Sequence, residues 1–180
     1  MFDLITYDNE GRPKLSVVVE NKTPTLAVFT AQNGIPPASD YATRDVRGIF
    51  PVLDFDNSTS ESIYFIGLMP QQYQNNGITG HLYFTSDATS GDVDWDISFD
   101  RLTSADLDID GNSFGDVSSS DGNNVSGTAG VITIATWSIA SGSAMDNVVA
   151  GDMFMVKLTR DVADTAAGDA NFLALELRGQ

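Results

Sequence analysis

Within the segment Gly91–Arg101 (GDVDWDISFDR), polar and apolar residues alternate from Asp92 to Asp100. Successive side chains of a β-strand point to opposite faces, so this alternation predicts a strand with one apolar face and one face rich in aspartate. In a helix, the same apolar residues would scatter around the axis. The apolar residues that set the register of this strand against a core are Val93, Trp95, Ile97 and Phe99.

Runs of β-prone residues parted by turn residues continue from Ile49 to the end of the chain. Asn75-Asn76-Gly77, for example, is a strong turn signal. Seven such runs predict strands: Ile49–Phe55, Glu61–Met69, Ile78–Ser86, Gly91–Arg101, Val131–Ile139, Met153–Arg160 and Asn171–Arg178. Part of Ser113–Val117 is a candidate for an eighth strand, and the polar stretch around it, Ser104–Gly130, otherwise predicts a long connection.

Seven or eight short strands at this spacing predict an all-β fold, either a sandwich or a small barrel. We expect a jelly-roll-like antiparallel β-sandwich in which two four-stranded sheets pack face to face. The residues expected to fill its core are Val93, Trp95, Ile97, Phe99, Phe154, Val156, Leu158, Leu173, Leu175 and Leu177.

The first 47 residues do not share this regular pattern. Two short β-prone runs, Lys14–Glu20 and Thr25–Thr30, are followed by Pro36-Pro37, which cannot join a central strand. We therefore expect an extended N-terminal arm over residues 1–47, long enough to touch a neighbouring molecule, and a sandwich domain over residues 48–180. The alternative is an N-terminal hairpin that folds back on its own domain.

The chain has 180 residues, no cysteine and a formal net charge of −16. Residues 1–50 hold five basic and six acidic residues, whereas residues 51–180 hold four basic and nineteen acidic ones. So acidic a domain repels nucleic acid and anionic membranes, which excludes both as direct partners. The absence of cysteine excludes disulfides and thiolate metal sites.

The sequence offers little support for catalysis, and we expect a protein that is not an enzyme. His81 is the only histidine and shares a strand face with Thr79 and Tyr83, which suggests a surface residue rather than a general base. The aspartates of Gly91–Arg101 stand at the two-residue spacing of an inverting glycosidase pair. A catalytic acid, however, requires burial beside apolar walls, which a solvated row of aspartates lacks.

One segment resembles a calcium-binding loop. Asp106, Asp108, Asp110 and Gly111 match positions 1, 3, 5 and 6 of such a loop. Position 12, however, is Val117 in place of the bidentate glutamate. We therefore expect no metal and no cofactor, with calcium at these three aspartates left open as the alternative.

Aromatic residues outside the predicted strands could stack on sugars. Tyr41 and Tyr73 are the candidates, while Trp95 and Trp137 lie on alternating faces of strands and are expected in the core.

Two segments, ATSGDVDWDISFDR (Ala88–Arg101) and MDNVVAGDMFMVKLTRD (Met145–Asp161), resemble small β-sandwich virion proteins of tailed bacteriophages. Capsid decoration (cement) proteins are among them. The resemblance covers roughly residues 50–178 and does not extend to the N-terminal arm. It implies a structural protein without an active site, located on the outer capsid surface of a virion assembled in the host cytoplasm.

The resemblance also implies the partners. A cement protein of this kind forms homotrimers, binds the major capsid protein and bridges neighbouring coat subunits through arms. On this hypothesis the contacts to coat or to neighbouring copies are made by residues 1–47, with the basic residues Arg12, Lys14, Lys22, Arg44 and Arg47. A tail-fibre or baseplate protein, or a calcium-dependent carbohydrate-binding module, are the alternative functions.

Overall fold

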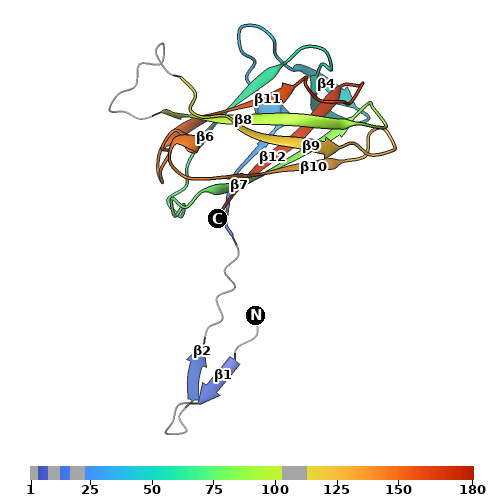
Figure 1. The fold of residues 1–180 in the computed structure, drawn as a ribbon. Coiled ribbons are helices and arrows are strands. Elements are labelled where there is room, and N and C mark those ends of the chain that lie inside the picture. Colours follow the sequence, from blue (N-terminus) through green and yellow to red (C-terminus); the bar gives the residue numbers. More distant parts are fainter. Residues whose placement is uncertain (1–3, 8–12, 17–22, 103–112) are drawn as a thin grey trace.

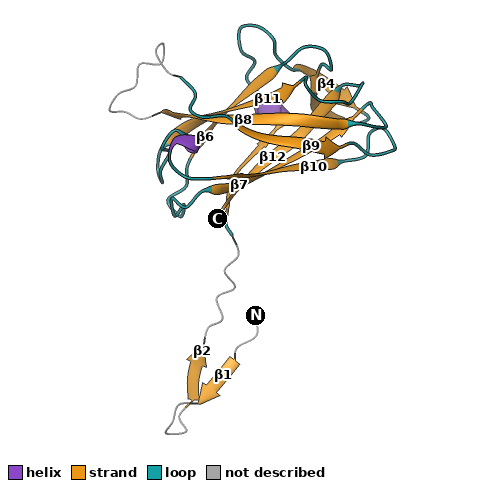
Figure 2. Cartoon of the chain, viewed as in Figure 1, coloured by secondary structure: helices purple, strands orange, loops and turns teal. Residues whose placement is uncertain are grey.

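The computed structural model describes residues 4–7, 13–16, 23–102 and 113–180 of the chain. These residues form strands, turns and two short 3₁₀ turns (Figure 1, Figure 2). The strands are β1 (Leu4–Tyr7), β2 (Pro13–Ser16), β3 (Thr25–Thr30), β4 (Thr43–Arg47), β5 (Phe50–Phe55), β6 (Ser62–Leu68), β7 (Ile78–Ser86), β8 (Asp92–Leu102), β9 (Ser118–Asn124), β10 (Thr133–Ile139), β11 (Met153–Asp161) and β12 (Ala170–Gly179). The 3₁₀ turns are η1 (Ala31–Asn33) and η2 (Ser143–Met145). No helix in the described part of the chain is long and apolar enough to cross a membrane.

Strands β5 to β12 form a jelly roll, which confirms the expected all-β sandwich. One sheet holds β10, β7, β12 and β5 in that order, and the facing sheet holds β6, β11, β8 and β9. Successive strands from β5 to β8 thus pass between the sheets, as the two Greek keys of a jelly roll require. All strand pairs that the structure describes are antiparallel, and each sheet buries one face against the other.

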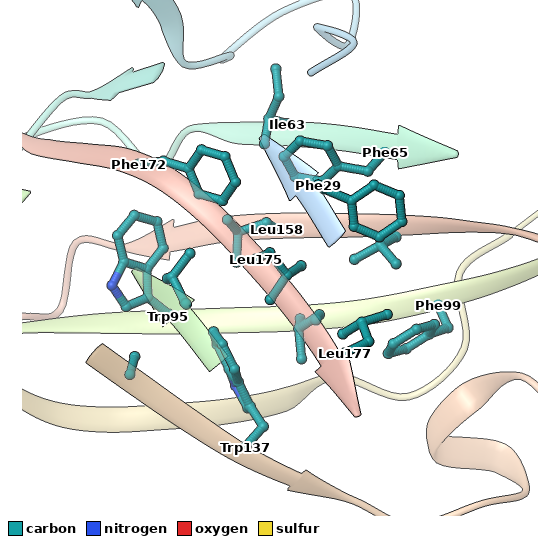
Figure 3. Close-up of a cluster of buried hydrophobic side chains, with 14 of the residues drawn as sticks. Phe29, Ile63, Phe65, Trp95, Phe99, Trp137, Leu158, Phe172, Leu175 and Leu177 are labelled. Carbon is teal, nitrogen blue, oxygen red and sulfur yellow. The ribbon is translucent and has the colours of Figure 1, made fainter. Parts of the chain in front are cut away.

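The core lies between the two sheets and is rich in aromatic residues (Figure 3). Trp95 of β8 has no exposed surface and meets the rings of Phe55 and Phe84 edge to face, with centroids 5.0 and 5.5 Å apart. Val93, Ile97 and Phe99 are buried beside it, so the apolar face predicted for this strand is confirmed.

Leu173 is the one residue of the predicted core that the two sheets do not bury. The pairing of β12 with β7 shifts register between Phe172 and Ala174. This bulge turns Phe172 inward and places Leu173 on the outer face, while Leu175 returns to the core. The alternation expected from the sequence therefore changes phase at this point.

The sandwich begins earlier in the chain than the sequence predicts. Strand β3 pairs with the C-terminal half of β12, and β4 pairs with β5, so both extend the first sheet to six strands. Leu26 and Phe29 of β3 reach the core, and their burial stabilises this pairing. The expected arm over residues 1–47 therefore does not stay apart over its whole length. Among the described strands, only the hairpin β1–β2 lies outside the sandwich (Figure 1).

The polar stretch Ser104–Gly130 contains a strand where a connection was expected. Strand β9 pairs with β8, although its sequence (SSSDGNN) has no apolar residue. The candidate eighth strand at Ser113–Val117 is not a strand in the structure, and β9 follows directly after it.

Candidate functional site

Two of the β8 aspartates, Asp94 and Asp96, accept hydrogen bonds from β9. Ser119 Oγ donates to Asp96 at 2.5 Å, and the backbone N–H of Gly122 donates to Asp94 at 2.6 Å. Asp94 and Asp96 are half-buried, and Asp100 is buried. Burial raises the pKa of the Asp94 carboxyl, and the bond from Gly122 opposes that shift. The face expected to be solvated is thus largely occupied by intramolecular contacts that hold a polar strand in the sheet.

Tyr73 does not carry the sugar-stacking role considered for it, because its ring is buried in the core cluster. Its hydroxyl lies 3.4 Å from the sulfur of Met145 and accepts a bond from the Gly77 N–H, and burial raises its pKa. Tyr41 is exposed, whereas Trp95 and Trp137 are buried as predicted. His81 stands on the outer face of β7, opposite Thr136 and Glu176 of the neighbouring strands.

The proposed calcium ligands Asp106, Asp108 and Asp110 lie outside the residues that the structure describes. Within the described ranges, no three carboxylate or histidine groups lie close enough together to hold a metal ion. The expectation of no metal, and the alternative of calcium at these three aspartates, are therefore both untested.

Two of the five basic residues predicted to bind a partner are engaged within the sandwich. Arg44 donates to the carbonyl oxygen of Gly34 at 2.9 Å, which ties β4 to the turn after η1. Arg47 pairs with Asp87 at 2.6 Å. Lys14 belongs to β2, where the backbone alone is described, and the other two basic residues, Arg12 and Lys22, lie outside the described ranges. Their contact with a partner remains a prediction.

A groove of ≈ 670 Å³ crosses the outer face of the six-stranded sheet. It is lined by Arg47, Gly48, Ile49, Phe50, Tyr83, Thr85, Gly130, Ile132 and Leu173. One wall is the β4–β5 hairpin, because Phe50–Val52 pairs with β4 alone while β12 pairs with β5 only from Leu53 onward. The floor is formed by the outer faces of β7 and β12, and the far wall by Gly130 and Ile132, which come just before β10.

The walls of this groove are apolar and uncovered. Ile49, Phe50 and Ile132 are 86%, 62% and 57% exposed, and Ile134, which pairs with the lining residue Tyr83, is also exposed. Ile49 follows Gly48 at the tip of the hairpin, where φ is +64° at Gly48. Hairpin tips usually carry polar residues, and contiguous apolar surface of this kind marks interaction sites.

Arg47, the charged residue of the groove lining, already has partners within the chain. Arg47 bridges the hairpin to the sheet, since its guanidinium donates to Asn171 of β12 and lies 3.4 Å from the carbonyl oxygen of Ser86. Asn171 in turn donates to the carboxylate of Asp54 at 2.6 Å. Burial, and then the nearby charge of Asp169, raise the pKa of Asp54. This network fixes the hairpin over the sheet and thereby holds the groove open.

Comparison with known proteins adds no relative: no family model matches the chain, and no curated protein matches its sequence.

Sequence reasoning missed the groove, although one signal for it was present. Ile49 and Phe50 directly follow a glycine turn, yet the predicted strand Ile49–Phe55 treats them as ordinary strand residues. Their exposure becomes evident only when the hairpin partner β4 is known. The bulge that brings Leu173 to the groove floor has no signal in the sequence pattern.

Proposed function

We propose that the protein is a structural virion protein of a tailed bacteriophage, a capsid decoration protein that binds the outer capsid surface and bridges coat subunits through its N-terminal segment. The observation that carries this proposal is the hairpin β1–β2, which pairs with itself and with no strand of the sandwich in the described residues. A lone two-stranded hairpin is barely stable in water. A partner molecule would supply the missing contacts.

Two further features agree with a non-enzymatic role. The resemblance of Ala88–Arg101 and Met145–Asp161 to phage virion proteins falls on β8 and β11, the central strands of one sheet. The aspartates of β8, the best candidates for acid–base chemistry, are instead used to hold β9. The acidic sandwich would face solvent, and the arm would face the coat.

The proposal is tested by deleting residues 1–22, which removes the hairpin and spares every strand of the sandwich. We expect the shortened protein to melt cooperatively near the temperature of the full chain, because it keeps every described strand of the sandwich, β3 to β12. Added to capsids that lack the protein, the full chain should sediment with them and the shortened chain should not. Undiminished binding of the shortened chain to capsids would contradict the proposal.

The position of the protein in the virion is tested by a separate measurement. Electron microscopy of virions carrying a tagged copy should show density on the head. Density on the tail or baseplate would favour the tail-protein alternative. Calcium-dependent binding to a glycan array would favour the carbohydrate-binding alternative.

A further inference from the structure

The register of the hairpin β1–β2, which forms a two-stranded sheet of its own, sorts its residues into two faces of different composition. Directly opposed residues of an antiparallel pair share a face, and the faces alternate along each strand. The register places apolar or aromatic residues on one face: Ile5, Tyr7, Pro13 and Leu15. It places Leu4, Thr6, Lys14 and Ser16 on the other face, where three of the four are polar. A hairpin of this composition requires an apolar surface that covers its first face.

The groove on the outer face of the six-stranded sheet has the complementary property. Its walls expose Ile49, Phe50 and Ile132 to solvent, and Arg47 in its lining already has partners within the chain. A ligand that enters it therefore gains mainly by burying apolar surface.

Charge favours a hairpin over a second sandwich as the occupant. Residues 1–22 contain four acidic and three basic residues, a net charge of −1, whereas residues 23–180 contain 21 acidic and six basic residues, a net charge of −15. Two sandwiches that met face to face would bring two strongly negative bodies together. A nearly neutral hairpin avoids most of this repulsion.

We propose that the apolar face of hairpin β1–β2 docks into the groove of a second copy of this chain. In Figure 1 the hairpin lies beyond the end of the sandwich at which β12 ends. The inference concerns only copies of this chain, so it does not depend on the proposed role on capsids.

Each copy then donates one hairpin and accepts one. Such an exchange closes as a reciprocal pair or as a ring where the rotation between copies permits it, and every groove is then filled. The trimer implied by the family resemblance is one such ring.

Sedimentation of single-residue variants tests the two surfaces. Ile5→Asp places a charge on the apolar face of the hairpin, and Ile49→Asp places one at the groove wall. We expect each to weaken self-association by about tenfold or more. The matched controls are Thr6→Asp, on the other face of β1, and Val28→Asp, on an exposed position of β3 outside the groove. Both should associate like the parent chain, and all four should retain its melting behaviour.

Cysteine cross-linking distinguishes docking between copies from docking within one copy. The chain has no native cysteine, so any disulfide must involve the introduced cysteines. One tagged copy carries Ile5→Cys and a differently tagged copy carries Ile49→Cys. Mixed under oxidising conditions, they should form a disulfide-linked heterodimer on a non-reducing gel. Thr6→Cys in place of Ile5→Cys should give much less of this product.

Three results would overturn the inference. The first is a full chain that stays monomeric up to millimolar concentration. The second is an oligomer unaffected by both Ile5→Asp and Ile49→Asp. The third is a chain carrying both cysteines that links only within itself, which would place the hairpin in its own groove. A monomer that still binds capsids would leave the proposed function standing and remove only this inference.

Discussion

Arg160 has no exposed surface, yet its guanidinium group carries a full positive charge. Nε and Nη2 lie 2.8 and 3.3 Å from the two carboxylate oxygens of Asp164. The remaining donors reach the carbonyl oxygens of Phe55, Ala166 and Gly168 at 3.1, 3.2 and 3.0 Å. All five N–H groups are thereby used, which is the condition under which a buried arginine is tolerated. The side chain joins β5 and β11 to the connection before β12.

Replacing Arg160 with methionine should destabilise the fold strongly. The substitution leaves the Asp164 carboxylate, whose side chain is 2% exposed, without its cation and removes the donors to three carbonyl groups. We expect a loss of about 3–5 kcal/mol in the free energy of unfolding, measured by urea denaturation. The control is Arg178→Met, which breaks a solvent-accessible pair with Glu176 and should leave stability near that of the parent chain. Equal effects of the two substitutions would contradict this account.

Among the secondary-structure elements, the start of β8 is clamped by the connection between β11 and β12. The backbone N–H groups of Thr165 and Ala166 both donate to the carbonyl oxygen of Asp92, at 3.2 and 2.9 Å. Gly91 precedes this clamp with φ at +91°, and a Cβ there would lie 2.6 Å from the carbonyl oxygen of Thr165. Glycine is therefore required at this position for both conformation and space.

A comparison of two alanine substitutions separates these two requirements. Gly142 has φ at +93°, and a Cβ added there would meet no other atom within 4 Å, so Gly142→Ala measures the conformational cost alone. That cost is about 1–3 kcal/mol. Gly91→Ala carries the same cost and also forces the Thr165 backbone aside, so we expect a loss larger by about 1 kcal/mol or more. Equal decreases in melting temperature for the two variants would show that moving the Thr165 backbone has no measurable cost.

For the molecule as a whole, the dominant electrostatic fact is a net charge of −16 with few cations to offset it. In the described part of the chain, burial raises the pKa of three carboxyl groups, those of Asp54, Glu61 and Asp94. A carboxyl whose pKa is raised on folding binds its proton more tightly in the folded state. Its contribution to stability is therefore present at low pH and is lost as the pH rises through the folded pKa.

The chain should accordingly be more stable just above pH 4 than at pH 7, because the loss begins at the ordinary pKa of a carboxyl group. Two of the described carboxyls act in the opposite sense, because hydrogen bonds from Ser58 to Asp56 and from Arg178 to Glu176 lower their pKa. Their contribution is lost below about pH 4, where stability should fall again. Thermal melting across this range is the measurement.

Asp54→Asn identifies the source of this pH dependence. The amide keeps an acceptor for Asn171 but cannot ionise. We expect the variant to be more stable than the parent chain at pH 7 and to lose that advantage as the pH approaches 4. A constant difference across the range would assign the effect to packing rather than to charge.

The strands whose apolar residues alternate could be predicted from the sequence, since that periodicity is local. Seven strands, the sandwich class and the buried face of β8 follow from it. Strand β3 was visible as a β-prone run, but its membership of the sheet was not, because pairing with β12 joins residues some 150 positions apart. The role of the β8 aspartates was equally hidden, because their partners are donors of a strand without apolar residues.

The candidate interaction surfaces, in contrast, depend on contacts between distant parts of the chain. The groove forms only where the β4–β5 hairpin, the bulge at Leu173 and the segment just before β10 come together, and no local pattern in the sequence predicts these contacts. The partner of Arg47 also depends on such contacts. The sequence suggested that Arg47 is available to bind another molecule, whereas in the structure it pairs with Asp87. Alternation along a chain sets which face of a strand is apolar, whereas the contacts between distant strands decide which apolar residues are left uncovered.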